Sequence, residues 1–478
     1  MNYKRILYVL GTVLALTGIF MLLPLVVGLI YHEYYPTLML ALSAFICIAV
    51  GLPLTRLKAR SSMFTIKDGY VTVALCWIVM SAAGALPFVF SGEIPNYLDA
   101  LFEIVSGFTT TGASIMTDVE AMSHCLLFWR SFSHWIGGMG VLVFILTLLP
   151  MADNGSSFSL MQAESPGPVV SKLVPRLRAS ARSLYGIYFG ISVLELILQA
   201  IGGMPLFDNL CLTFGSMGTG GFGVLNDSVA GYSPYLQWVI IIFMLLAGTN
   251  FGVYFLLLCR QGRAVLRMEE VRWYYAIVAG ATLFISLDLL NYGQFNSVRE
   301  VLFQVASIIT TTGYSTTDFA LWPSFSKGIL MLLMMLGACA GSTGGGMKVS
   351  RLVIYLKTGA QELRRLVKPR EVRTIRMDGK KLERAVVRGS LLFLVCYVLI
   401  FVLSLLIIQL ENLDLETSFT AVAATLNNIG PGLSLVGPTA NFSIMSPLSK
   451  VVLIFDMLAG RLEIFPILVL LAPQTWKK

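Results

Sequence analysis

The sequence is poor in charge, and its cysteine and histidine residues are few and scattered. Charged residues make up 13% of the chain, against 56% for hydrophobic residues. No two cysteines form a CxxC pair and the three histidines lie apart, which excludes a metal centre or disulfide framework of the usual spacing. The cysteines occupy positions 47, 76, 125, 211, 259, 339 and 396, mostly inside apolar runs. These absences, with a mean hydropathy of +0.79, indicate a polytopic membrane protein.

A catalytic constellation is also missing. The run Ser131-Phe132-Ser133-His134 lacks the nucleophile turn of a hydrolase, and no acidic cluster suggests metal catalysis. We therefore expect no enzymatic activity and no covalently bound cofactor.

Long apolar runs supply the fold class. Ten of them are long enough to cross a membrane as helices, and the first continues to about Ile30, which indicates a true span and not a cleavable signal. We therefore expect an all-α polytopic fold. The runs cover roughly residues 6–30, 36–55, 68–90, 124–149, 181–203, 235–259, 273–291, 325–356, 387–410 and 448–472.

Four shorter apolar pieces lie between these runs, near residues 97–108, 206–217, 299–310 and 416–427. Each has about 12 residues, or roughly 18 Å as a helix, against a hydrocarbon core of roughly 30 Å. They can enter a membrane without crossing it. A span, a half-helix, a polar loop and a second span then form one unit, which recurs at intervals of about 100 residues.

The boundaries of this repeat follow from the same spacing. Residues 1–60 hold two additional transmembrane helices, and four helix–pore-loop–helix repeats in a pseudo-fourfold arrangement follow them. These repeats cover residues 61–155, 156–265, 266–365 (with a broken inner helix) and 366–478.

A polar phrase that ends in glycine follows each short piece. Backbone carbonyls at such a loop can replace the water around a cation, and glycine lets the backbone approach an axis without a Cβ clash. Irregular backbone at this depth is tolerated where it lines a cavity or is buried in protein. Four such loops predict a cation pathway. The candidate ion-binding residues are Thr110, Thr111 and Gly112; Thr219, Gly220 and Gly221; Thr311, Thr312 and Gly313; and Asn428, Ile429 and Gly430.

The basic residues orient the chain. Of the 34 Lys and Arg residues, 29 fall on connections that lie on one side of the expected spans. By the positive-inside rule this side is the cytoplasm, and both termini lie there. The net charge of +8 is thus a sign of topology and not of nucleic-acid binding, although this surface is suited to anionic lipid or a partner.

Twelve of the 26 acidic residues lie on the other side, on the half-helices or the loops beside them, where carboxylates raise the local cation concentration. Asp99, Asp208, Glu300 and Glu416 sit early in half-helices, where they also oppose the helix dipole. Among the remaining charges, we expect Arg130, Lys327 and Lys450 to snorkel from outer helix ends. Glu195, inside a span, fits either an ion site or a structural hydrogen bond.

The third unit contains a glycine-rich segment that should break its inner helix. It includes Gly337, Gly341, Gly344, Gly345 and Gly346, followed by Lys348. The pattern resembles a phosphate loop, but Met347 occupies the lysine position and the preceding run is apolar, so we exclude nucleotide binding. Close helix packing by small residues is one interpretation; a movable element in the pathway is the other.

Arg461 lies deep inside the last run, where an arginine faces a partner or water. Glu463 is two residues away and points elsewhere on a helix, so it is a poor partner. Carbonyl groups of the glycine-rich segment are a better one. A purely structural arginine, satisfied by neighbouring helices, is the alternative.

The four glycine phrases and Gly460-Arg461-Leu462-Glu463 resemble those of the Trk/Ktr family of potassium-uptake membrane subunits, over essentially the whole chain. The two additional N-terminal helices make the chain more similar to the Trk type. The family keeps one glycine per filter loop, here Gly112, Gly313, Gly430 and either Gly220 or Gly221. No loop contains TVGYG, so the resemblance implies a modest preference for potassium over sodium and good passage of rubidium.

The resemblance also implies how the pathway is controlled. The glycine-rich segment and Arg461 would form a gate beneath the filter. A cytoplasmic TrkA-like nucleotide-binding subunit would regulate it, and the protein would be a homodimer in the bacterial inner membrane. The competing hypothesis is a sodium- or proton-coupled secondary transporter with discontinuous helices.

Overall fold

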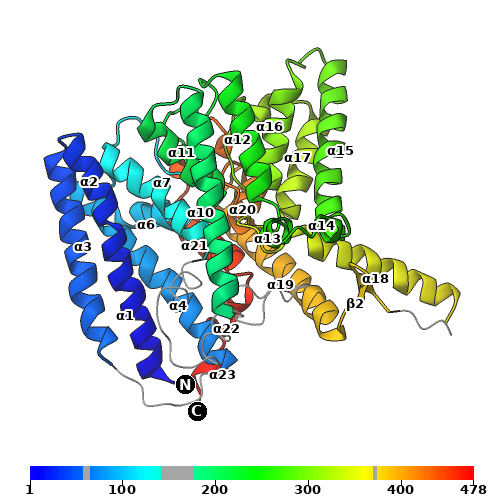
Figure 1. The fold of residues 1–478 in the computed structure, drawn as a ribbon, viewed down its shortest axis with the longest axis horizontal. Helices are drawn as coiled ribbons and strands as arrows, with labels where there is room; N and C mark the ends of the chain where they lie inside the picture. Colours follow the sequence, from blue (N-terminus) through cyan, green and yellow to red (C-terminus); the bar gives the residue numbers. More distant parts are fainter. Residues whose placement is uncertain (58–64, 141–176, 370–373, 478) are drawn as a thin grey trace.

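The computed structural model describes residues 1–57, 65–140, 177–369 and 374–477. These residues are almost entirely helical (Figure 1). The only strands in the described residues are β1 (Arg376–Met377) and β2 (Lys380–Lys381), which form a small antiparallel hairpin with Arg376 opposite Lys381. The expectation of an all-α polytopic protein is confirmed.

Three helices precede the repeated part of the chain. They are α1 (Tyr3–Phe20), α2 (Leu22–Ile30) and α3 (Tyr34–Thr55). Gly11 and Gly51 allow α1 and α3 to pack closely, since a Cβ on either would lie within 3 Å of the other helix. Figure 1 shows these helices together at one side of the molecule.

The remaining helices repeat one order: a long helix, a short helix, a loop and a second helix that ends early. In sequence they are α4 (Ile66–Gly84), α5 (Leu86–Ser91), α6 (Tyr97–Phe108) and α7 (His124–Gly138); α10 (Leu177–Ile201), α11 (Leu206–Gly218), α12 (Pro234–Ala247), α13 (Phe251–Leu258) and α14 (Gly262–Leu266); α15 (Glu269–Asn291), α16 (Val298–Ile309), α17 (Ser324–Leu336) and α18 (Val349–Val367); and α19 (Arg384–Ile408), α20 (Leu415–Leu426), α21 (Pro447–Arg461), α22 (Phe465–Leu471) and α23 (Pro473–Trp476). The outer loops add single 3-10 turns at Phe319–Leu321, Gln409–Glu411, Ser434–Val436 and Phe442–Ile444.

The proposed repeat boundaries stay predictions. Those near residues 60 and 155 lie outside the described residues, as do residues 141–149 of the fourth expected span.

Six helical segments in the described part are long and apolar enough to cross a membrane. They match the expected spans at 6–30, 36–55, 68–90, 181–203, 273–291 and 387–410. A seventh crossing counts only if α12 and α13, which meet at a bend of 91°, are taken as one span. The sequence predicts ten runs of spanning length, one of them broken by glycines, whereas six form unbroken helices of that length within the described residues.

The difference is concentrated in the second helix of each unit. Each stops after 13 to 15 residues, at or beside a glycine. In two units the reason is close packing: a Cβ on Gly137 would lie 1.8 Å from the Phe108 carbonyl oxygen, and one on Gly460 would lie 2.0 Å from that of Leu426. In these two units glycine lets the second helix touch the end of the short helix. The length of an apolar run does not predict this contact.

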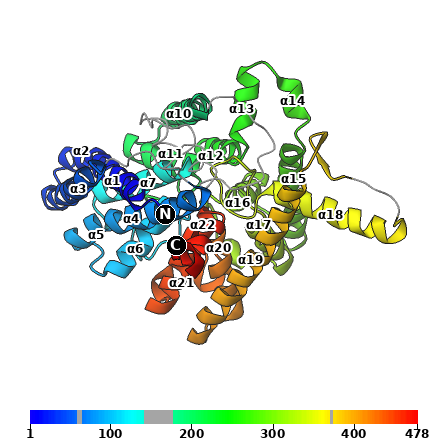
Figure 2. The same ribbon diagram turned by 90° about the horizontal axis from the view of Figure 1, so that it is seen from below.

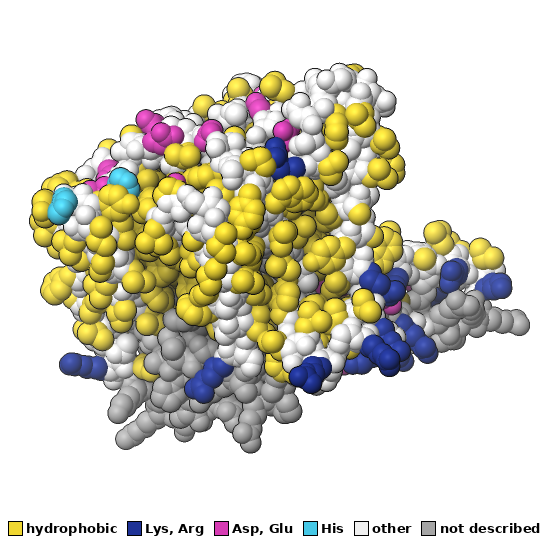
Figure 3. Space-filling model, turned by 45° about the horizontal axis from the view of Figure 1, so that its top comes forward, with side chains coloured by type: hydrophobic (Ala, Val, Ile, Leu, Met, Phe, Trp, Pro, Cys, Tyr) yellow, Lys and Arg dark blue, Asp and Glu magenta, His cyan; other side chains and the backbone are white. Residues whose placement is uncertain are grey.

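Charge is sorted between two ends of the molecule (Figure 3). Acidic side chains gather along the upper edge of this view, whereas Lys and Arg lie mainly along the lower edge and over α18. Residues 2 and 474 both reach the start of α4, since Asn2 N–H donates to Asp68 and the Lys67 ammonium donates to the Gln474 carbonyl, each at 3.4 Å. Figure 2 shows both chain ends at that place, with α18 extending away from the body.

Candidate functional site

The chain leaves the short helices α6, α11, α16 and α20 by one shared backbone path. In each loop a residue that is not glycine lies in the left-handed region, one or two residues after the short helix ends, and a glycine with positive φ follows two residues later. The first set is Thr110, Thr219, Thr311 and Asn428, with φ of 56–58°, and the second is Gly112 (79°), Gly221 (73°), Gly313 (86°) and Gly430 (103°). A threonine with positive φ is rare and strained. Four repeats of the pattern indicate one conformation used four times.

The second loop contains two adjacent glycines, and its backbone distinguishes them. Gly221 has positive φ and lies two residues after Thr219, as Gly112 lies two residues after Thr110. Gly221 is thus the structural equivalent of the other three loop glycines. Gly220 instead packs against His134, because a Cβ there would lie 2.1 Å from the ring nitrogen Nδ1.

The loop glycines bring the four loops together in a closed ring. A Cβ on Gly112 would lie 2.0 Å from the carbonyl oxygen of Gly220, in the next loop. The corresponding distances are 1.9 Å from Gly221 to Thr312, 2.1 Å from Gly313 to Ile429 and 2.8 Å from Gly430 to Thr111. Each loop therefore meets the next, and the fourth returns to the first. Any side chain at these glycines would displace a carbonyl group of the neighbouring loop.

Side chains inside the loops hold the backbone. The hydroxyl groups of Thr109 and Thr111 lie 2.8 Å apart, and those of Thr310 and Thr312 form the same contact at 2.8 Å. The Asn428 amide donates to the Thr111 hydroxyl at 2.9 Å, which ties the fourth loop to the first. All of these side chains are buried. They brace the loops whose carbonyl groups form the ring.

The helix breaks at the glycine-rich segment, residues 337–348, as the sequence predicts. Gly337, Gly341 and Gly346 have φ of 70°, 71° and 74°. The segment lies against the start of two loops: Gly345 N–H donates to the Thr311 hydroxyl at 2.6 Å, and a Cβ on Gly345 would lie 2.4 Å from the Asn427 carbonyl oxygen. The structure thus brings this segment to the ring.

Two charged side chains hold the glycine-rich segment from within the third unit. The buried Glu270 carboxylate, at the start of α15, accepts hydrogen bonds from Ala340 N–H at 2.6 Å and Ser350 N–H at 3.1 Å. The Lys348 ammonium donates to the Gly344 carbonyl. The sequence analysis missed Glu270, because an acidic residue at the beginning of an apolar run is typical of a helix end facing water.

Arg461 reaches both the glycine-rich segment and the ring. Its guanidinium donates to the Thr343 carbonyl at 2.7 Å, to the Gly138 carbonyl at 2.7 Å and to the Gly137 carbonyl. A further bond joins it to the Thr110 hydroxyl at 3.1 Å. Glu463 pairs instead with Arg351, at the start of α18.

The expectation that Arg130, Lys327 and Lys450 snorkel is wrong. Arg130 is buried and its Nε lies 2.5 Å from the Glu103 carboxylate. Lys327 pairs with Glu416 at 3.0 Å, and Lys450 pairs with Asp99 at 2.6 Å. Each basic residue meets a carboxylate on a short helix, which is more favourable than extending to water from a helix packed inside the protein.

Glu195 on α10 is fully buried and accepts hydrogen bonds from the Ser216 hydroxyl at 2.5 Å and the Gln199 amide at 3.0 Å. These contacts match the second of the two expectations, a structural hydrogen bond, and they link α10 to α11.

Apolar helices of spanning length, together with four short helices whose glycine loops meet inside the protein, define a multi-pass membrane protein with a ring of irregular backbone at its centre. The family described as TrkH, cation transport protein, matches residues 37–478. The chain belongs to this family, which is a family of transporters and not of enzymes.

Named relatives and one solved structure agree over the full length. The chain is 36% identical to the Trk system potassium uptake protein TrkH of Salmonella typhimurium, over 100% of both chains. It is 32% identical to the Trk system potassium uptake protein TrkG of Escherichia coli, over 100% of this chain and 99% of the relative. The crystal structure of the potassium transporter TrkH from Vibrio parahaemolyticus superposes with a TM-score of 0.88 at 33% identity, over 100% of both chains.

Proposed function

We propose that this protein carries potassium ions into the cell through a pathway lined by the four loops. The observation that carries the proposal is the closed ring of Gly112, Gly221, Gly313 and Gly430, each with positive φ and each against the carbonyl group of the next loop. The names of the relatives, which are potassium uptake proteins, support potassium as the transported substrate.

The chemistry of the ring suits a partly dehydrated monovalent cation. The C-terminal ends of α6, α11, α16 and α20 direct the negative ends of their dipoles toward it. Carbonyl oxygens at the loop glycines and the residues before them would replace water around the ion. Since no loop has a complete TVGYG string, we propose a short filter with a modest preference for potassium, which also passes rubidium and some sodium.

We further propose that the glycine-rich segment closes the inner end of this pathway, with Lys348 and Arg461 holding it closed. The basic face would lie in the cytoplasm, with both chain ends there and anionic lipid beside it. A TrkA-like nucleotide-binding subunit would dock on that face and release the segment. A homodimer in the bacterial inner membrane is part of this proposal.

A second candidate is a sodium- or proton-coupled secondary transporter. The bend of 91° between α12 and α13 favours it, because discontinuous helices form the substrate sites of such proteins. A conduit and a transporter differ in whether uptake depends on a second ion in a saturable way.

Rubidium uptake into potassium-starved cells that lack their own importers tests the proposal. The native chain is compared with Gly313→Ser, whose side chain would meet the Ile429 carbonyl. Two matched controls are Gly328→Ser, on a helix with open space, and Gly293→Ser, with φ of 68° and open space. We expect uptake that external potassium inhibits, retained in both controls and largely lost in Gly313→Ser.

Three other outcomes would contradict the proposal in different ways. Uptake unchanged in Gly313→Ser would remove this loop from the pathway. Equal loss in Gly293→Ser would attribute the effect to backbone strain alone. Uptake with a saturable requirement for sodium or protons would favour the transporter.

A further inference from the structure

The second loop lacks the internal support of the first and third loops. In the first and third loops, two threonine hydroxyls flank the left-handed residue and contact each other, as described above. In the second loop the same two positions are Gly218 and Gly220. The hydroxyl of Thr219 donates back to the Gly218 carbonyl at 2.6 Å and reaches no neighbouring loop in the hydrogen bonds of the described residues. A loop of this composition needs support from outside.

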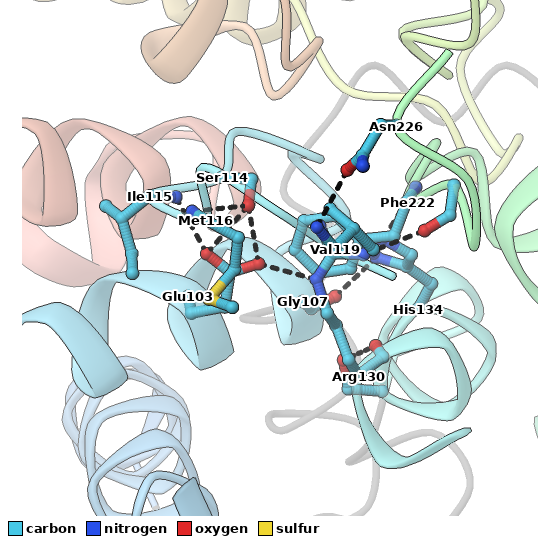
Figure 4. Close-up of polar contacts among 12 residues, drawn as sticks. Glu103, Gly107, Ser114, Ile115, Met116, Val119, Arg130, His134, Phe222 and Asn226 are labelled. Atoms are coloured by element: carbon cyan, nitrogen blue, oxygen red, sulfur yellow. Dashed lines mark hydrogen bonds and ion pairs between the residues drawn. The ribbon is translucent and has the colours of Figure 1, made fainter. Parts of the chain in front are cut away.

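Three buried side chains of the first unit supply that support, and we name them the α7 clasp: Glu103 on α6, and Arg130 and His134 on α7 (Figure 4). The Glu103 carboxylate accepts from Arg130 Nε at 2.5 Å, from Ile115 N–H at 2.9 Å and from the Ser114 hydroxyl at 2.9 Å. Glu103 thus ties the chain beyond the first loop to α7.

Arg130 extends the tie to the second loop. Its second nitrogen donates to the Gly223 carbonyl at 3.1 Å, and its guanidinium carbon lies 3.5 Å from the centre of the Phe222 ring. Because Phe222 directly follows Gly221, this contact restrains the chain immediately after the loop glycine.

His134 adds a second tie to the same place. Its Nδ1 lies 2.8 Å from the Gly107 carbonyl and its Nε2 lies 3.3 Å from Phe222 N–H. These partners assign the neutral tautomer with the proton on Nδ1, which donates to Gly107 while Nε2 accepts from Phe222. The two rings also pack, with centroids 4.2 Å apart. One imidazole therefore joins the first short helix to the second loop.

The ion pair of the clasp occurs in one unit of the four. Nine residues before the loop glycine, the units have Glu103, Leu212, Gln304 and Ala421; at the seventh residue of the second helix they have Arg130, Ile240, Leu330 and Leu453. Gln304 braces its own loop through Thr316 at 3.1 Å, as Glu103 does through Ser114, but no guanidinium joins it to the neighbouring loop. The clasp is thus an asymmetric addition at a loop that lacks the hydroxyl pair.

The outer ends of the same two loops are joined as well. The Asn226 side chain accepts from Val119 N–H at 2.8 Å and donates to the Asp118 carboxylate at 2.9 Å. This hydrogen bond lowers the pKa of the Asp118 carboxyl below its ordinary value. The first and second loops are therefore tied at two levels.

We propose that Glu103, Arg130 and His134 are positioning residues that set the preference for potassium over sodium by fixing the Gly221 carbonyl group. The inference rests on the proposed function. Sodium is smaller than potassium, so a ring of carbonyls that cannot contract pays more to coordinate it. A second loop freed from the clasp would close around sodium more easily.

The test transplants the third unit's residues into the first, as Glu103→Gln together with Arg130→Leu. Removing both charges avoids an uncompensated buried charge, and glutamine keeps an acceptor for Ile115 N–H. The matched control, Glu416→Gln together with Lys327→Leu, removes an ion pair at the outer edge between α17 and α20. In cells, the readout is rubidium uptake and the concentrations of potassium and of sodium that halve it.

We expect the clasp variant to retain rubidium uptake while the sodium-to-potassium ratio of half-inhibiting concentrations falls about fivefold or more, with the control unchanged. An unchanged ratio at normal uptake would overturn the inference. If the double variant does not reach the membrane, the same ratio of half-inhibiting concentrations is measured for His134→Phe. If that variant does not insert either, the clasp serves folding alone. Absence of rubidium uptake by the native chain would contradict the proposed function instead.

Discussion

The ring of four loops and the glycine-rich segment contain similar residues but are held in different ways. In the ring, every loop glycine packs against a carbonyl group of another loop, and buried threonine, asparagine and histidine side chains brace the backbone. The glycine-rich segment also makes close backbone contacts with the loops, and three charged side chains hold it in addition: Glu270 on α15, Arg461 on α21 and its own Lys348. Charged side chains can exchange partners more readily than backbones packed in van der Waals contact. If the segment acts as the proposed gate, we expect its charged contacts to be the ones that change while the ring keeps its shape.

The largest expected effect comes from breaking the ring. Gly112→Ala combines φ of 79° with a Cβ 2.0 Å from the Gly220 carbonyl oxygen. We expect displacement of this carbonyl from the ring to lower rubidium uptake roughly tenfold or more, whereas the left-handed strain of about 1–2 kcal/mol acts on folding stability and is shared by the control. Gly92→Ala is the matched control, since Gly92 has φ of 80° and open space around it. A similar loss in both variants would show that strain, and not the ring contact, matters.

A smaller effect, of opposite sign, is expected at the glycine-rich segment. Arg461→Gln removes the charged bonds to Thr343 and Gly138, so the segment should leave the ring more often. We expect rubidium uptake without the regulatory subunit to rise roughly tenfold, because the glutamine amide keeps a donor and only part of the about 1.5–3 kcal/mol of a charge-assisted bond is lost. In Arg461→Lys, which keeps the charge but loses the planar guanidinium, uptake should rise less. Reduced uptake in Arg461→Gln would mean that its bond to Thr110 supports the ring instead.

The smallest expected effect is at Glu270. In Glu270→Gln the amide oxygen still accepts from Ala340 and Ser350, so the segment loses charge assistance but keeps both bonds. We expect uptake without the regulatory subunit to rise about twofold to fivefold, from a loss of roughly 0.5–1 kcal/mol. In Glu270→Leu, which removes the acceptor, uptake should rise further. If both variants and the native chain show equal uptake, Glu270 does not help to hold the glycine-rich segment against the ring.

The sequence predicts the parts of the structure that depend on local composition. Short apolar pieces that end in glycine phrases gave the four short helices and their loops, and five closely spaced glycines gave the broken helix of the third unit. The sorting of charge is visible in Figure 3 as the sequence predicts. These features need no knowledge of what packs against them.

Features that depend on contacts between helices were missed. Arg130 and Glu103 lie on different helices, and only the fold shows that α7 packs on α6 with both side chains enclosed. The choice between Gly220 and Gly221 required backbone angles, because both residues fit the phrase equally. The early ends of the second helices likewise depend on contacts of Gly137 and Gly460 with distant carbonyls.

Residues 2 and 474 both contact the start of α4, which makes the chain a candidate for circular permutation. Because both ends reach the start of α4, we expect that a short peptide could join them and that new ends could be opened in an exposed outer loop. Because the loops contact one another in a closed cycle, such a rearranged chain retains every contact of the ring. The units could then be synthesised in a different order and still assemble into the same ring.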